Sequence, residues 1–279
     1  MRYAALYLLA ACGGTEGKAL RPQAARAPLS LAADDHMILI PDGKYIAGST
    51  PEERATAYDD LQIATTTDTA REQGWFEKEA DRHQTTLPAY RIDLMPVTQA
   101  QYAEFVSAGK APPPALPDPG EVARFSWTST TPPQDRLDHP VVLVTWDEAS
   151  RYCAWRGELR GQARRLPSAG EYEKAARGTT GLAYPWGNTF EPSKLNSADG
   201  GPKDTVPAGQ FAGGASEFGL LDIAGNVRQW TSTSAGQGAY LVKGSGWDDH
   251  GGIGRAAWVH ATAAGERAAN VGFRCAGSP

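Results

Sequence analysis

The sequence lacks any long apolar run. A membrane-spanning helix needs about 20 consecutive apolar residues, and no stretch of the 279 residues reaches that length. Basic residues are fewer than acidic ones, and the formal net charge is −5. Proteins that bind phosphate backbones need a basic face. We therefore expect neither a spanning helix nor a nucleic-acid partner, and no internal repeat is visible.

Glycine and proline, in contrast, are abundant, at 31 and 20 residues. This content exceeds that of an average globular protein and indicates many turns and irregular segments. Hydrophobic residues make up 41% and charged residues 21%, which is ordinary for a soluble globular chain. Eight tryptophans supply large apolar surfaces for a core with little regular structure.

The first twelve residues have the pattern of a lipoprotein signal segment. Met1-Arg2 gives a positive start, residues 4–9 are mostly apolar, and Leu9-Ala10-Ala11-Cys12 has the form of a lipobox. The apolar run is shorter than the roughly 7–15 residues of a typical signal core, so an apolar N-terminus without this role is the alternative. Lipidation of Cys12 predicts an exported protein anchored to a membrane of the cell envelope. Residues 13–35, rich in Ala, Gly, Pro and Arg, are then a disordered tether.

Two cysteines remain if Cys12 is lipidated. Disulfides persist in exported proteins, so Cys153 and Cys275 are candidates for a bridge. Two separate buried thiols are the alternative, and these residues alone leave both readings open.

Three helix starts carry the same local signal, a capping box. In this motif a hydroxyl side chain accepts the backbone N–H three residues later, and the acid or amide at that position bonds back. The pairs are Thr98 with Gln101, Thr145 with Glu148, and Ser168 with Glu171. Each predicted helix is about ten residues long and ends at a glycine. These glycines are Gly109, Gly157 and Gly178.

The remaining pattern predicts short strands and long loops. Residues 51–82 are charged and helix-permissive, and we interpret them as an inserted helical segment. Residues 112–133 are proline-rich and predict a long loop, and after Gly178 turn signals replace helical ones. We therefore expect one α+β domain over residues 36–279. The predicted strands are residues 37–40, 44–48, 90–95, 141–144, 227–231, 240–243 and 271–275.

Seven segments, in this order, resemble the formylglycine-generating enzyme (sulfatase-modifying factor) family. They include the motifs Gly225-Asn226-Val227-Arg228-Gln229-Trp230 and Gly272-Phe273-Arg274-Cys275. The resemblance extends over nearly the whole predicted domain. It implies a C-type-lectin-like fold, in which a small twisted sheet supports long ordered loops. The segments are residues 37–43, 97–105, 139–142, 165–173, 185–188, 223–230 and 270–275.

The catalytic cysteines of that family are missing here. Its enzymes oxidise a sulfatase cysteine to formylglycine with two cysteines that hold copper, and soft thiolates are the ligands that Cu(I) prefers. Counted from Gly244-Ser245, the two positions fall on Asp248 and Ile253. We therefore expect no copper and no formylglycine synthesis. The resemblance also aligns Cys153 and Cys275 with a structural disulfide of the family.

The family also binds calcium through oxygen ligands, as a hard cation requires. The resemblance places one such site at Asp222, Gly225 and Val227, with Gln229 where an acid is usual. A second site would include Asn196 and Asp199. Loop residues that cap their own turns are the alternative for both sets.

Three functions remain open from the sequence. The first is a non-catalytic binding or scaffold protein of the envelope, whose ligand is a protein, a peptide or a glycan. The second is an oxidoreductase that binds iron or another metal through Asp248, Asp249, His250 and His260, although their spacing matches no fixed metal motif. The third is an accessory factor in sulfatase maturation. The predicted ligand-binding surface comprises Trp247, Asp248, Asp249, His250, Arg255 and His260.

Overall fold

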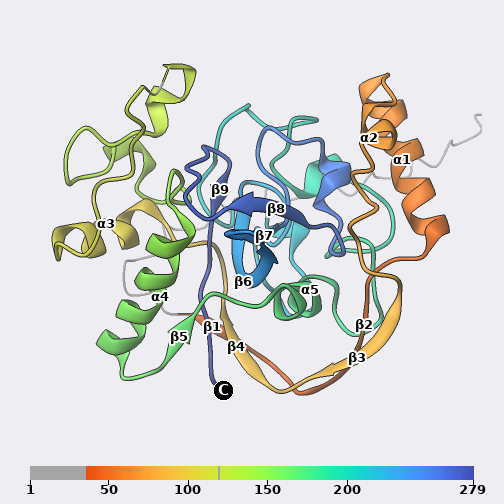
Figure 1. The fold of residues 1–279 in the computed structure, drawn as a ribbon, viewed down its shortest axis with the longest axis horizontal. Coiled ribbons are helices and arrows are strands. Elements are labelled where there is room, and N and C mark those ends of the chain that lie inside the picture. Colours follow the sequence, from red (N-terminus) through yellow and green to blue (C-terminus); the bar gives the residue numbers. More distant parts are fainter. Residues whose placement is uncertain (1–35, 119) are drawn as a thin grey trace, which may run out of the picture.

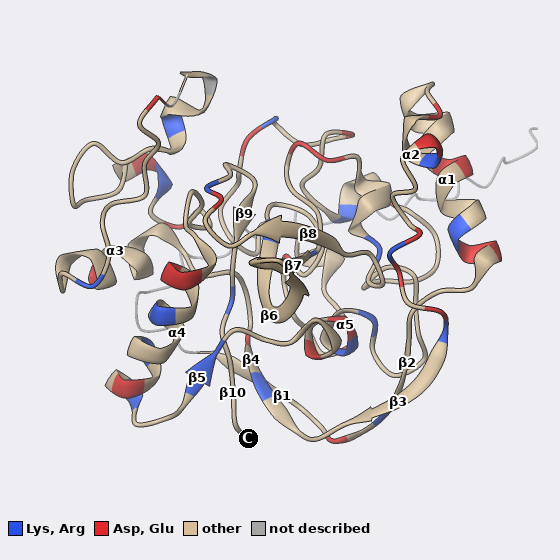
Figure 2. Ribbon diagram, in the orientation of Figure 1, with Lys and Arg blue, Asp and Glu red and all other residues tan. Residues whose placement is uncertain are grey.

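The computed structural model describes residues 36–118 and 120–279. The predicted signal segment with Cys12 and the tether 13–35 lie outside the described residues. Within these ranges no helix combines the length and the apolar character that crossing a membrane requires. Figure 2 shows acidic and basic residues interspersed over the elements rather than gathered by sign.

Three small sheets form the β part of the fold (Figure 1). The strand orders are β1-β4-β10-β5, β2-β3 and β8-β7-β6-β9, and among these strands of the described residues only β6 and β9 pair in parallel. The strands are β1 (Met37–Ile40), β2 (Gly43–Ala47), β3 (His83–Leu87), β4 (Tyr90–Asp93), β5 (Arg164–Arg165), β6 (Arg228–Gly236), β7 (Ala239–Lys243), β8 (His260–Ala263), β9 (Val271–Gly272) and β10 (Ala276–Gly277).

Helices flank the sheet of β6, β7 and β8 on both sides. Figure 1 shows α3 and α4 at one side of this sheet and α1 and α2 at the other, with α5 next to β6. Long connections join these short elements, and the mixed architecture confirms the predicted α+β class. The helices are α1 (Pro51–Thr65), α2 (Thr69–Glu72), α3 (Gln99–Ser107), α4 (Trp146–Arg160) and α5 (Ala169–Arg177).

The largest apolar cluster lies where α3 and α4 pack against the β6–β9 sheet. Trp230 of β6 is fully buried at its centre and donates its indole N–H to the Val144 carbonyl at 3.0 Å. Tyr102 and Tyr152 stack with ring centroids 5.6 Å apart. A disulfide between Cys153 of α4 and Cys275 closes this layer, with Cα atoms 5.5 Å apart. The predicted bridge is therefore confirmed.

All three predicted capping boxes are present, at the starts of α3, α4 and α5. Gly109 follows the last residues of α3, and Gly178 caps α5 as expected. The prediction that Gly157 ends a helix was wrong, because α4 continues to Arg160 and is capped by Gly161. Gly157 instead allows a close approach, since a Cβ there would lie 2.4 Å from the Gln162 carbonyl oxygen.

Two strand predictions were also wrong. Residues 141–144 are buried but pair in no sheet, because Leu143 adopts a left-handed conformation with φ of 60° that interrupts an extended run. Residues 271–275 hold only the two-residue strand β9, and β10 follows in a different sheet. The predicted strands at 37–40, 44–48, 90–95, 227–231 and 240–243 correspond to β1, β2, β4, β6 and β7, whereas β3, β5 and β8 were not predicted.

Candidate functional site

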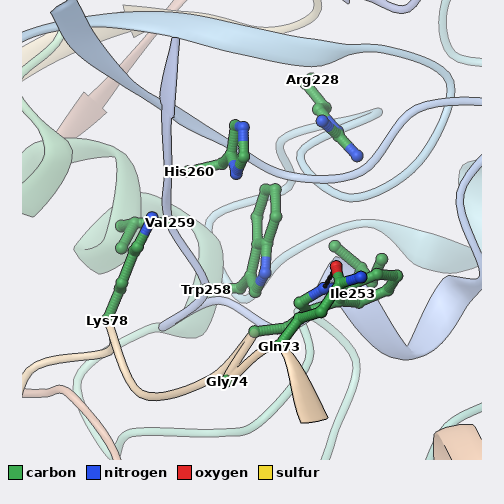
Figure 3. A pocket seen from close by; sticks show the side chains of 9 residues that line it. Gln73, Gly74, Lys78, Arg228, Ile253, Trp258, Val259 and His260 are labelled. Atoms are coloured by element: carbon green, nitrogen blue, oxygen red, sulfur yellow. Dashed lines mark hydrogen bonds between the residues drawn. The ribbon is translucent and has the colours of Figure 1, made fainter. Parts of the chain in front are cut away.

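A cavity of about 350 Å³ lies between the inserted segment 51–82 and the C-terminal part of the chain. Its size falls in the range of small-molecule sites. One wall is the turn 73–78, and the other comes from the start of β6, the 3₁₀ helix η6 (Gly251–Gly254) and the segment entering β8. Figure 3 shows the lining residues, which are Gln73, Gly74, Trp75, Lys78, Arg228, Ile253, Trp258, Val259 and His260.

The inserted segment is held in place by its own apolar contacts. A capping box at Thr50 and Glu53 starts α1, and Tyr58 of α1 packs on Phe76 with ring centroids 4.8 Å apart. The Tyr58 hydroxyl accepts the Phe76 backbone N–H at 3.0 Å. These contacts fix the turn that forms the first wall of the cavity.

A buried ion pair joins this segment to the second wall. Arg255 donates its Nε–H to Glu79 at 3.3 Å, and the two side chains are 6% and 0% exposed. The Arg255 guanidinium also lies 5.7 Å from the Phe76 ring centroid. Arg255 was expected on an exposed ligand-binding surface, but it acts as a buried link between two chain segments 176 residues apart.

Arg228, Trp258 and His260 form the second wall (Figure 3). The Arg228 guanidinium lies 5.2 Å from the Trp258 ring centroid, and the His260 ring lies nearly parallel to that indole at 5.9 Å. Arg228 donates its Nε–H to the Asp249 carboxylate at 2.7 Å and a second N–H from Nη2. The ion pair fixes the guanidinium beside the cavity.

Burial and neighbouring charges determine the protonation states of Arg228 and His260. Burial lowers the pKa of Arg228, but the hydrogen bond and the charge of Asp249 outweigh it, and the net pKa is raised. Partial burial lowers the pKa of His260, and the positive charges of Arg228 and Lys78 lower it further. The imidazole is therefore neutral at neutral pH, while Arg228 stays charged.

Asp248 and Ile253, the positions that the resemblance assigns to the missing cysteines, have different surroundings. Ile253 lines the cavity and belongs to an apolar cluster that includes Tyr58, Leu61, Phe76 and Trp258. Asp248 lies outside the cavity lining, and its two carboxylate oxygens accept the Asn270 amide N–H groups at 3.0 and 3.1 Å. Burial raises the pKa of Asp248, and the neighbouring Asp249 adds to this.

The other residues of the predicted ligand-binding surface do not converge on the cavity. Trp247 stacks on Phe125 at 5.6 Å and donates its indole N–H to Ala269. His250 lies 2.7 Å from an Asp199 oxygen. Of the six residues in that set, only His260 lines the cavity. The cavity is also lined by Arg228, Trp258 and the turn 73–78, and no metal-binding or catalytic motif in the sequence marks these residues.

The first predicted calcium set is already used for internal hydrogen bonds. One Asp222 carboxylate oxygen accepts N–H groups from Gly209 and Asn226. The Asp222 carbonyl accepts from Gln229 and Arg274, and the Gly225 carbonyl accepts from Val227. A calcium ion requires six to eight oxygen ligands, and a guanidinium at this point repels a cation. The residues present do not fit calcium.

The second set offers a single open oxygen. The Asn196 side-chain carbonyl is buried and has no hydrogen-bond partner among the described residues. The Asp199 carboxylate, however, is engaged by His250 and by the Gly251 N–H at 2.6 Å.

Among residues 36–118 and 120–279, no three His, Cys, Asp or Glu side chains are grouped as metal ligands. Asp248, Asp249, His250 and His260 therefore do not fit the predicted iron site.

Comparison with known proteins identifies one family. The Sulfatase-modifying factor enzyme 1-like domain matches residues 23–279. The inactive C-alpha-formylglycine-generating enzyme 2 of Mus musculus is 30% identical over 303 aligned residues, which cover 91% of this chain and 89% of that protein. A formylglycine-generating enzyme of Mycobacterium tuberculosis is 32% identical, with 57% and 68% covered. A hercynine oxygenase of Mycolicibacterium thermoresistibile is 31% identical, with 60% and 40% covered.

Solved structures share the fold. PvdO from Pseudomonas aeruginosa superposes with a TM-score of 0.66 at 20% identity, covering 87% of this chain and 94% of that chain. CarF superposes with a TM-score of 0.57 at 16% identity, covering 88% and 98%. These similarities confirm the predicted C-type-lectin-like fold.

Proposed function

Because this chain belongs to the Sulfatase-modifying factor enzyme 1-like family and has no cysteine at the two catalytic positions, we propose that it binds a ligand without oxidising it. The number of free cysteines is the observation that supports this proposal. The sequence contains three cysteines, and Cys153 and Cys275 are joined to each other. Cys12 alone remains, and a copper site made of two thiolates needs two free cysteines.

The surroundings of Ile253 favour binding over chemistry. The side chain has no donor atom, and it forms part of the apolar lining of the cavity. Ile253 therefore offers a ligand apolar contact surface and no metal-binding atom. The relative from Mus musculus is named an inactive enzyme, which supports the same interpretation.

Copper binding tests the proposal. The full-length protein is titrated with Cu(I) against a competing chelator, and we expect no stoichiometric binding. The matched variant, Asp248→Cys with Ile253→Cys, supplies two thiolates and gains Cu(I) affinity if the loop 244–254 keeps its geometry. Stoichiometric Cu(I) binding by the unchanged protein would refute the proposal.

We also propose that lipidation of Cys12 anchors the protein to the cell envelope. A single acyl chain gives only marginal attachment, so the multiply acylated cysteine of a lipoprotein is required. In the native host, Cys12→Ser is expected to move the protein from the membrane to the soluble fraction, as detected by immunoblotting. A wild-type protein found only in the soluble fraction would contradict this assignment.

A further inference from the structure

We infer that the cavity beside Ile253 binds a small ligand that carries a carboxylate next to an aromatic ring. The inference rests on the proposed binding function and adds the chemical class of the ligand. It is drawn from three features of the lining residues: their charge, their open hydrogen-bond donors and their flat apolar surfaces.

The charge of the lining favours an anion. No Asp or Glu is among the residues that line the cavity, whereas the cations Lys78 and Arg228 and the neutral His260 are. Asp249 offsets the charge of Arg228, and Asp248 and Glu266 act on the same guanidinium from outside the lining. Lys78 is exposed and has no ion-pair partner within the described ranges. Within the lining, Lys78 is thus the positive charge without an acidic partner, which favours a singly charged carboxylate over a doubly charged phosphate.

Two donors are open for such a group. The hydrogen bonds of Arg228 to Asp249 use Nε and Nη2, so its Nη1 group has no partner in the described part of the chain. The Lys78 ammonium supplies the second donor. A carboxylate has two oxygens and pairs well with guanidinium and ammonium groups, which Arg228 offers from the second wall and Lys78 from the turn that forms the first.

The rest of the lining suits an aromatic body. Trp75 is partly exposed and donates its indole N–H to the Gln73 side chain at 3.0 Å, so its ring is held in one orientation. Val259 and Ile253 add aliphatic surface, and Trp258 supports Arg228. Aromatic rings gain from stacking on such surfaces. A volume of about 350 Å³ admits one ring and its acid group.

Two sources share this chemistry, a free aromatic acid and the C-terminal aromatic residue of a peptide. Calorimetry on the full-length protein distinguishes them with phenylacetate and N-acetyl-Gly-Phe as probes. Phenylacetamide, phenethylamine and acetate are the controls for the charge and for the ring. We expect phenylacetate, the dipeptide acid or both to bind, and each of the three controls to bind at least about tenfold more weakly.

Lys78→Gln is the decisive variant, because Arg228 variants would leave the buried Asp249 without its partner. Loss of a charged hydrogen bond is expected to weaken binding of the acid about tenfold. The Trp75→Leu variant is also expected to weaken binding of the acid. Lys44→Gln, at an exposed position of β2, is expected to leave that binding unchanged. Equal affinity for acid and amide, no binding of either acid, or an unaffected Lys78→Gln would overturn the inference. The copper titration is a separate measurement, so a failure of this inference can be distinguished from a failure of the proposed function.

Discussion

The Arg255–Glu79 ion pair joins the two walls of the cavity. Both groups are almost fully buried, and Arg255 packs against Phe76 as well. Removing one partner of a buried ion pair leaves the other charged group in a poorly solvated position. The pair therefore couples the stability of the domain to the position of the turn 73–78.

Arg255→Met tests this coupling. Glu79 would be left buried without a counter-charge, and the free energy of unfolding is expected to fall by roughly 3–5 kcal/mol. Chemical denaturation measures the change. The matched control is Arg71→Met, which removes exposed pairs with Asp59 and Asp68 and should cost less than about 1 kcal/mol. Equal losses in the two variants would show that burial of the Arg255–Glu79 pair contributes nothing.

At the residue scale, the sequence indicates which residues belong to a site better than it indicates which side chains they contact. Spacing within one short loop assigns Ile253 to a catalytic position as a prediction, and the structure shows that Ile253 lines the cavity. Arg255 was expected on the surface but is buried against Glu79, which lies 176 residues away. His250 is partly exposed as expected, but its partner Asp199 lies 51 residues away. No local pattern contains that information. Arg228 lies within the motif 225–230, yet its contacts are with Asp249 and Trp258, which the fold brings near.

Among the elements, helix starts were predicted well because capping is local. A hydroxyl and an acid or amide three residues apart specify each start, and Gln101 shows that an amide suffices. The box at Thr50 and Glu53 carries the same signal and was not predicted. Strand predictions failed where long-range contacts decide. The apolar residues 141–144 are buried in the core, and a buried apolar segment need not pair in a sheet.

The capping box of α5 contributes pH-dependent stability. Burial raises the pKa of Glu171, but the hydrogen bonds from Arg165 and Ser168 outweigh it, and the net pKa is lowered. A carboxyl group with a lowered pKa stabilises the folded state above its unfolded pKa of about 4.3. That contribution is lost as the pH falls through the folded pKa.

Glu171→Gln isolates this contribution. The amide can still accept the Ser168 N–H, but it cannot pair with Arg165, whose two bonds to Glu171 are both 2.7 Å. We expect the variant to be less stable than wild type at pH 7, with the difference shrinking as the pH falls below about 4. Thermal unfolding across this range is the measurement. A difference that is independent of pH would contradict the assignment.

The whole molecule keeps long loops ordered by burying charged side chains among backbone carbonyls. Arg274 donates to the carbonyls of Asp93, Leu94, Leu221 and Asp222. The disulfide adds a constraint over 122 residues, worth roughly 4–5 kcal/mol in the chain-entropy treatment. Composition predicted a turn-rich fold, but not which buried groups would hold the turns. The same disulfide consumes two of the three cysteines, which is the basis of the functional proposal.

The absence of thiol oxidase chemistry is the central claim, and an aldehyde assay tests it most directly. A cysteine peptide of the sulfatase type is incubated with the full-length protein, copper and oxygen, and its mass is followed. A formylglycine-generating enzyme, such as the Mycobacterium tuberculosis relative, serves as the positive control. We predict that the peptide cysteine stays unmodified, because Asp248 and Ile253 supply no thiolate. Repeated turnover to the aldehyde would contradict the account and would place the catalytic positions elsewhere in the chain.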